Sequence, residues 1–128
     1  MDDQMKVLLV DDDERNIFAL SAYLKVKKFS ITTARDGEEC LAKLNEGQFD
    51  VVLLDMMMPV MDGFQTLEVM RKDPKLMHNK VIALTALAMK GDKERCLEAG
   101  ADEFCAKPVN IDVLVNKINN LVKNNGNS

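Results

Sequence analysis

The sequence predicts an α/β fold in which a doubly wound, five-stranded parallel sheet is built from five strand-helix units, (βα)5. Five short apolar runs recur at near-even spacing, and the segments between them carry apolar residues at helical spacing. A run as continuously apolar as residues 51–54 is typical of a parallel strand that is covered on both faces. Right-handed crossovers between such strands give an open sheet with helices on both sides.

The first two units each pair an apolar run with an amphipathic segment. Residues 5–10 precede a helix expected at 14–27, and residues 29–34 precede one expected at 36–46. The apolar stripe of the first helix is Ile17, Leu20 and Leu24, and that of the second is Cys40, Leu41 and Leu44. Each helix can therefore pack one face on the sheet.

The remaining three units follow the same order, with strands expected at 50–55, 80–85 and 102–106 and helices at 62–72, 87–98 and from 111 onward. Gly100 favours the end of the fourth helix because glycine readily adopts the left-handed conformation, and Asn110 is a good N-cap for the fifth. We expect one domain over residues 1–124 and a disordered tail at 125–128.

Composition limits the class of protein. The net charge of -4, with 21 acidic residues, argues against direct binding to nucleic acid. The three cysteines are odd in number and lack metal-type spacing, so we expect reduced, buried thiols and a cytoplasmic protein. The N-terminus lacks the features of a signal peptide, and no apolar run approaches the roughly 18 residues of a membrane span. We therefore expect a soluble chain without a membrane partner.

Acidic residues close two of the apolar runs. Asp11 and Asp12 follow the first run, and Asp55 ends the third. The carboxyl ends of neighbouring parallel strands meet at one edge of the sheet, where like charges need a cation. A hard ion such as Mg²⁺ prefers such oxygen ligands, so the sequence predicts a divalent-metal site. Helix capping remains an alternative role, because Asp12 or Asp13 could cap the helix that begins near residue 14.

Two other strand ends carry complementary groups. The fourth strand ends in Thr85-Ala86, and Lys107-Pro108 follows the fifth. A hydroxyl and an ammonium at this edge could bind the oxygens of a tetrahedral anion, and Asp55 could then attack a phosphoryl donor to form an acyl phosphate. Taken singly, Thr85 could be a β-former or cap, and Lys107 a solvated charge.

From Lys6 to about Val122, the chain resembles the receiver domain of two-component response regulators. The resemblance rests on these motifs: Val10-Asp11-Asp12, Leu53-Leu54-Asp55-Met56 with Pro59 and Asp62-Gly63 downstream, Leu84-Thr85-Ala86, and Lys107-Pro108. It is similar to chemotaxis regulators, and residues 88–102 also look like receivers of hybrid sensor kinases. The resemblance implies the flavodoxin-like strand order 2-1-3-4-5.

The resemblance implies that Asp55 accepts a phosphoryl group from the phosphohistidine of a histidine kinase or histidine phosphotransfer protein. Asp11, Asp12, Asp55 and the backbone carbonyl of Met57 would hold Mg²⁺, with Mn²⁺ as an alternative ion.

The resemblance also implies how the domain switches. Thr85 and Lys107 would bind the phosphoryl oxygens, and Phe104 would turn toward the space that Thr85 vacates, past the small Ala86. The Lys107-Pro108 peptide bond is expected to be cis. Helix four, strand five and helix five would then present a changed surface to a downstream protein that the sequence does not identify, in a monomer or weak dimer.

The resemblance implies a signalling domain rather than an enzyme, one that assists its own phosphorylation. Met57 and Leu87 are apolar and cannot orient an attacking water, so autodephosphorylation is expected to be slow.

Three other functions share some features of this sequence. The chain could be an interaction module that works without phosphorylation. A haloacid-dehalogenase-like phosphatase would need a longer chain and a Thr or Val at position 15, where this sequence has Arg15. A flavodoxin-like electron carrier would share the fold, but carboxylates in its first loop would repel a flavin phosphate.

Overall fold

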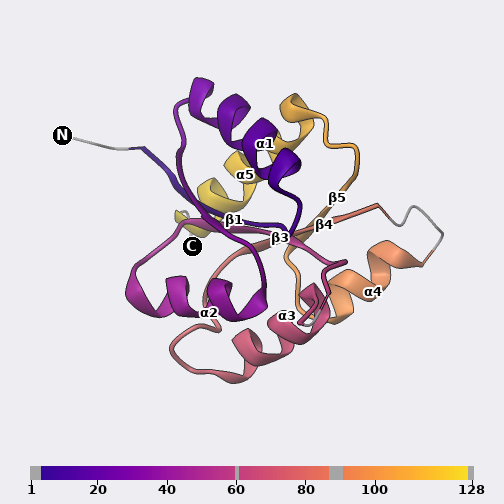
Figure 1. Cartoon of the computed structure of the whole chain (residues 1–128). Coiled ribbons are helices and arrows are strands. Elements are labelled where there is room, and N and C mark those ends of the chain that lie inside the picture. The colour runs from indigo at the N-terminus through magenta and orange to yellow at the C-terminus, as the bar shows by residue number, and fades with distance from the viewer. Residues whose placement is uncertain (1–3, 60, 87–90, 127–128) are drawn as a thin grey trace.

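Five parallel strands form a single sheet in the order β2-β1-β3-β4-β5, which confirms the predicted fold class and strand order. The computed structural model describes residues 4–59, 61–86 and 91–126. The strands are β1 (Lys6–Val10), β2 (Ser30–Ala34), β3 (Val51–Asp55), β4 (Val81–Thr85) and β5 (Glu103–Ala106). They cross the centre of the molecule in Figure 1.

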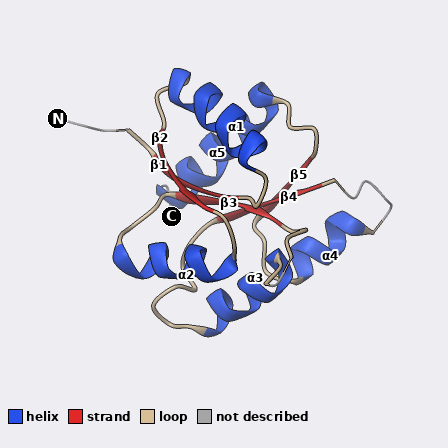
Figure 2. Ribbon diagram, viewed as in Figure 1, coloured by secondary structure: helices blue, strands red, loops and turns tan. Residues whose placement is uncertain are grey.

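The helices form one layer on each side of the sheet (Figure 2). One layer contains α1 (Glu14–Val26) and α5 (Ile111–Gly126), and the other contains α2 (Gly37–Glu46), α3 (Gly63–Lys72) and α4 (Asp92–Glu98). Alternate residues of the central strands face the two layers, as a strand requires. In β1, Val7 and Leu9 pack with the α1 and α5 side, whereas Leu8 and Val10 pack with the other side.

Aspartates fix the beginnings of three helices. Asp13 accepts a hydrogen bond from the backbone N–H of Arg15 at the start of α1, and Asp36 caps α2. Asp62 caps α3 and forms a reciprocal capping box with Gln65. Each cap lies just beyond the carboxyl end of a strand, so the three helices begin beside the same edge of the sheet.

The fourth helix is shorter than the sequence predicted. Residues 87–90 lie outside the described part of the chain, and Gly91 has a left-handed backbone (φ 101°), so the described helix begins at Asp92. The expected end is present, because Gly100 has a φ of 118°.

At the C-terminus, α5 reaches Gly126, beyond the boundary expected at residue 124, and residues 127–128 lie outside the described part. The N-cap expected for α5 is present, since Asn110 Oδ1 accepts from the N–H of Val113 at 3.1 Å. No described helix has both the length and the apolar character that crossing a bilayer requires.

The cysteines Cys40, Cys96 and Cys105 are free and buried, as expected. Burial raises the pKa of the Cys40 thiol to about 12, so this sulfur stays protonated and behaves as a small apolar group.

Candidate functional site

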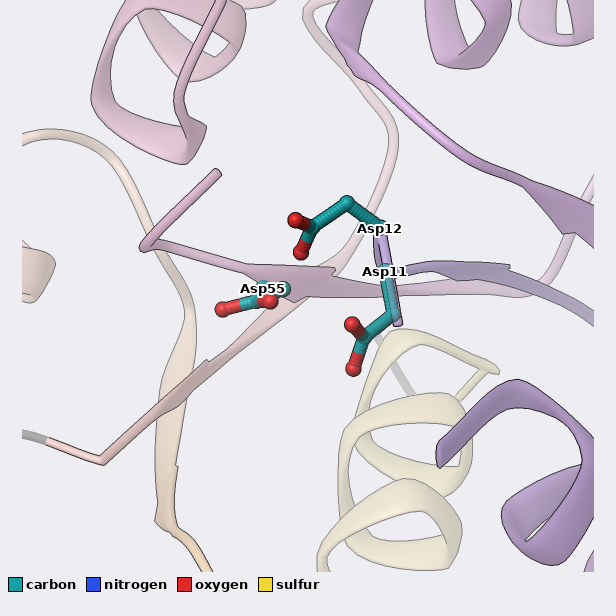
Figure 3. Close-up of side chains that lie close together, drawn as sticks. All are labelled: Asp11, Asp12 and Asp55. Atoms are coloured by element: carbon teal, nitrogen blue, oxygen red, sulfur yellow. The ribbon is translucent and has the colours of Figure 1, made fainter. Parts of the chain in front are cut away.

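Three carboxyl groups lie together at the carboxyl edge of the sheet (Figure 3). Asp11 directly follows β1 and Asp55 ends β3, and these strands are neighbours in the sheet. One oxygen from each of Asp11, Asp12 and Asp55 lies within 4.8 Å of the others. Asp11 and Asp55 are buried, and Asp12 is exposed. The structure therefore brings together the acidic residues that the sequence singled out.

Backbone hydrogen bonds orient the two buried carboxylates. Asp11 Oδ1 accepts from the N–H of Asp13 at 2.9 Å, and Asp55 Oδ1 accepts from the N–H of Met57 at 3.0 Å. The second oxygen of each, Oδ2, faces Lys107. Because Asp13 caps α1, the alternative capping role for Asp12 is excluded.

Lys107 lies between the buried carboxylates. Its Nζ is 3.2 Å from Asp11 Oδ2 and 3.2 Å from Asp55 Oδ2, and its side chain is mostly buried. The Lys107 N–H donates to the carbonyl of Thr85 at 2.9 Å, and the Lys107-Pro108 peptide bond is cis. The ammonium group thus offsets part of the repulsion between the two acids.

Burial and the charge of the oppositely charged partner shift the pKa values of Asp55 and Lys107 in opposite directions. Burial is the largest effect on Asp55 and raises its pKa to about 6; the charge of Asp11 adds to this, whereas the Met57 N–H and Lys107 oppose it. Burial lowers the pKa of Lys107, but the charges of Asp55 and Asp11 outweigh this effect, and the net shift is upward. The Asp55 carboxyl group is therefore harder to ionise than an ordinary aspartate.

The donor set fits a hard divalent cation. With all three carboxylates ionised, the single ammonium of Lys107 leaves two negative charges uncompensated at this edge. The clustered ligand atoms are all carboxylate oxygens, which Mg²⁺ prefers. A divalent ion would balance the cluster.

The other predicted residues surround this cluster. Thr85 ends β4 and is buried, and the adjacent Ala86 is exposed. Phe104 lies in β5 beside Ala83 and is partly buried against the core on the α2, α3 and α4 side. The Met57 side chain is exposed, and Leu87 lies outside the described residues.

An apolar groove adjoins the cluster and was not foreseen from the sequence. It has a volume of about 440 Å³ and is lined by α1, Ala86 and the segment from Lys107 to Ile111. Tyr23, which lines the groove, is exposed, and α1 also exposes Phe18 and Val26, which are not among the lining residues. The sequence carried only a partial signal, because Tyr23 falls outside the apolar stripe of the helix, and the rest of the groove depends on how α1 packs beside residues 107–111.

Known proteins are similar to this chain in sequence and in fold. A profile of the response regulator receiver domain matches residues 7–119. The response regulator PleD of Caulobacter vibrioides is 37% identical over 92% of this chain, which spans only 26% of the length of that protein.

Two solved structures have the same fold. The receiver domain of the Francisella response regulator 1452 matches with a TM-score of 0.88 and 34% identity, covering 95% of this chain and 99% of the other. The receiver domain of a sensor histidine kinase from Pseudomonas aeruginosa, solved with a magnesium ion coordinated in its active-site cleft, matches with a TM-score of 0.86 and 29% identity, covering 94% of this chain and 98% of the other.

Proposed function

Because this chain belongs to the response regulator receiver domain family, we propose that it is the phosphoacceptor of a two-component phosphorelay and that Asp55 takes the phosphoryl group. The observation that carries this proposal is the position of Asp55, a buried carboxylate at the edge of the sheet with Lys107 3.2 Å away. Its donor would be the phosphohistidine of a histidine kinase or histidine phosphotransfer protein.

In the proposed reaction, an Asp55 carboxylate oxygen attacks the phosphorus atom of phosphohistidine. The new O–P bond gives an acyl phosphate, while the P–N bond breaks and its electron pair returns to the donor imidazole. Lys107 would exchange its contact with the Asp55 carboxylate for a phosphoryl oxygen, and the Thr85 hydroxyl would donate to another.

Asp11, Asp12, Asp55 and the backbone carbonyl of Met57 would hold Mg²⁺, or Mn²⁺ in its place. The bound ion would neutralise charge on the phosphoryl oxygens. The magnesium ion in the related structure from Pseudomonas aeruginosa supports this assignment.

The signal would arise from new contacts to the phosphoryl group. Phosphorylation replaces a carboxylate by a group of roughly -1.5 to -2 charge, which would draw Thr85 inward. Phe104, already partly buried, would follow into the vacated space beside the small Ala86. The surface of α4, β5 and α5 would then change for a downstream protein partner.

The acyl phosphate would be long-lived. Exposed Met57 has no group that could orient a water molecule for attack, which supports slow autodephosphorylation. Leu87, the second residue in this expectation, lies outside the described residues. The domain would assist its own phosphorylation without turning over a substrate.

The apolar groove gives the donor protein a surface on which to dock. It reaches Lys107 at one end and α1 at the other, so a helix carrying phosphohistidine could lie on α1 with its imidazole near Asp55. Three buried free cysteines are consistent with the reducing cytoplasm as the site of this exchange. We propose that the domain acts as a monomer or weak dimer.

Intact-mass spectrometry after incubation with acetyl phosphate and Mg²⁺ tests the function. Wild type should gain one phosphoryl group, Asp55→Asn none, and the exposed-site control Asp112→Asn one. A folded wild type that gains no phosphoryl group would favour an interaction module that works without phosphorylation.

A further inference from the structure

The methionine that follows the end of β3 by two residues is exposed, although both of its neighbours are buried. The Met57 side chain is 52% exposed, whereas Met56 is fully buried and Met58 is 7% exposed. Met77 is a second exposed methionine in the described part of the chain, with a similar fraction of 53%. A small oxidant in solvent can therefore reach the Met57 sulfur, while the sulfurs on both sides of it are shielded.

Met57 is also close to Asp55 in space. Its backbone N–H donates to Asp55 Oδ1 at 3.0 Å, so the Met57 backbone is fixed against the carboxylate. A methionine side chain is unbranched and has three rotatable bonds, which let its sulfur take several positions around its own backbone. An oxygen atom added to this sulfur can therefore contact water beside a phosphoryl group on Asp55.

The other sulfur atoms are poor targets or lie far from the site. Cys40, Cys96 and Cys105 are buried, and burial raises the pKa of each thiol, so little of the reactive thiolate is present. Met77 precedes β4 and so lies toward the amino edge of the sheet, opposite the carboxylate cluster. Oxidation of Met77 should therefore not affect Asp55.

The charge of the site favours a neutral oxidant. The carboxylates of Asp11, Asp12 and Asp55 lie together at this edge (Figure 3), and they repel anions. Hydrogen peroxide is uncharged and meets no such barrier. In its reaction with a thioether, a sulfur lone pair attacks one peroxide oxygen and the O–O bond breaks. The sulfur is oxidised to the sulfoxide, and the peroxide is reduced to water.

We propose that Met57 is a peroxide-sensitive modification site, and that its oxidation to the sulfoxide shortens the lifetime of the acyl phosphate on Asp55. This inference rests on the proposed function and adds a means of regulating the same site. A thioether is a weak hydrogen-bond acceptor, whereas a sulfoxide carries a polar oxygen. The oxidised side chain can accept a hydrogen bond from a water molecule and orient it toward phosphorus, which the unoxidised side chain cannot do.

The oxidised side chain is not consumed when the acyl phosphate is hydrolysed. The water oxygen bonds to phosphorus, and the bond between phosphorus and Asp55 breaks with its electron pair returning to the carboxylate. The protons of the water leave with inorganic phosphate or pass to solvent. One oxidation of Met57 therefore affects every later phosphorylation until a methionine sulfoxide reductase restores the thioether.

The lifetime of the acyl phosphate, measured with and without prior oxidation, tests the inference. The whole chain is treated with hydrogen peroxide, freed of peroxide with catalase, phosphorylated with acetyl phosphate and Mg²⁺, and desalted. Intact mass then follows the loss of the phosphoryl group. Oxidised wild type should lose it at least about fivefold faster than untreated wild type, which is the effect of about one added hydrogen bond to the attacking water. Treatment with methionine sulfoxide reductases should restore the original lifetime.

Three variants assign the effect to one sulfur. Met57→Leu should have the same lifetime before and after peroxide treatment, because leucine has no sulfur to oxidise. Met57→Gln supplies an amide oxygen in place of the sulfoxide oxygen and should shorten the lifetime without peroxide. Met77→Leu removes the other exposed methionine and is the matched control, so it should respond to peroxide as wild type does.

Peptide mapping of the same samples keeps this inference separate from the proposed function. The map locates each added oxygen, including any on Met1 or Met89, which lie outside the described residues. A Met57 that is oxidised without a change in lifetime overturns the inference alone, and so does a Met57→Leu protein that responds to peroxide as wild type does. Untreated wild type that gains no phosphoryl group overturns the proposed function, and the inference with it.

Discussion

Asp55 is the residue at which burial and function are most directly opposed. Only 3% of it is exposed, beside another buried acid, and its pKa is raised to about 6. A reactive carboxylate must nevertheless be ionised to attack phosphorus. The fold would therefore keep the proposed nucleophile in a site where its charge is costly until a cation or a phosphoryl group arrives.

Stability should depend on pH through this residue. The pKa of Asp55 rises from 3.8 to about 6 on folding, so the protonated form is favoured in the native state. The contribution of Asp55 to the free energy of unfolding is therefore fully present below pH 3.8 and is lost as the pH rises through about 6. Without divalent ions, the free energy of unfolding should lose on the order of 2 kcal/mol across that window, and Asp55→Asn should remove this loss.

Urea denaturation in EDTA at a series of pH values measures the effect as the difference between wild type and Asp55→Asn. Asp112→Asn is the control, because that carboxylate is 86% exposed and should follow wild type. Parallel curves for wild type and Asp55→Asn would contradict the upward pKa shift.

Mg²⁺ should stabilise the protein in proportion to the ionisation of the same residue. Binding to the native state alone adds stability that grows with the logarithm of ion concentration. At pH 7, millimolar Mg²⁺ should raise the melting temperature of wild type by several degrees, and by clearly less in Asp55→Asn. A thermal melt at pH 5 should show a smaller effect because Asp55 is then protonated; an equal rise in both proteins at pH 7 would place the ion elsewhere.

At the scale of the helix, α1 and α4 end in the same way with different residues. In both helices, carbonyls of the last turn accept hydrogen bonds from the backbone N–H groups of the two residues that follow the C-cap. These residues are Lys28 and Phe29 after α1, and Gly100 and Ala101 after α4. The left-handed position holds Gly100 in α4 but Lys28, with a φ of 74°, in α1. A side chain at that position strains the backbone of α1.

Replacing Lys28 by glycine should therefore stabilise the protein by about 0.5–1 kcal/mol, because glycine adopts a positive φ without penalty. This gain in stability should appear as a higher midpoint of urea denaturation for Lys28→Gly than for wild type. Lys25→Gly is the control, since glycine inside α1 should destabilise by about 1 kcal/mol. A lower midpoint for Lys28→Gly would mean that the lysine side chain makes compensating contacts.

Most strands and helices could be predicted from local sequence patterns. The features that could not be predicted depend on backbone conformations or on long-range contacts that these patterns do not reveal. The strand positions followed from apolar runs because both faces of the sheet are covered. The beginning of α4 was misplaced because Gly91 adopts a left-handed backbone that the apolar pattern does not reveal. The hydrogen bond from Arg71 Nε to the carbonyl of Gly100 joins residues 29 positions apart in sequence, and such a contact has no local signal.

At the scale of the whole molecule, the site could be located because topology alone brings strand ends together. Because β1 and β3 are neighbouring parallel strands, Asp11 and Asp55 at their carboxyl ends lie close together. The groove could not be deduced in this way, because it depends on how α1 packs beside the segment that follows β5.

The groove leads to a prediction about partner recognition. Tyr23 lines the groove on α1 and is 59% exposed, and Tyr23→Ser should slow phosphotransfer from a phosphorylated histidine phosphotransfer protein by about tenfold or more. The rate with acetyl phosphate, which needs no docking surface, should stay within about twofold. Val69→Ser, on α3 across the sheet, is the apolar control. Equal losses with both donors would show damage to the site rather than to docking.

The position of Lys117 has a consequence for the behaviour of the protein at high concentration. β5 lies at one end of the strand order, so among the described residues no strand pairs with its outer backbone groups. Lys117 Nζ donates to the carbonyl of Phe104 at 2.7 Å and lies 3.4 Å from Glu103. A strand from another molecule would have to displace this charged side chain before it could pair there, and charged edges of this kind oppose aggregation. The charged contact therefore lets β5 remain an edge strand while opposing the growth of intermolecular sheets.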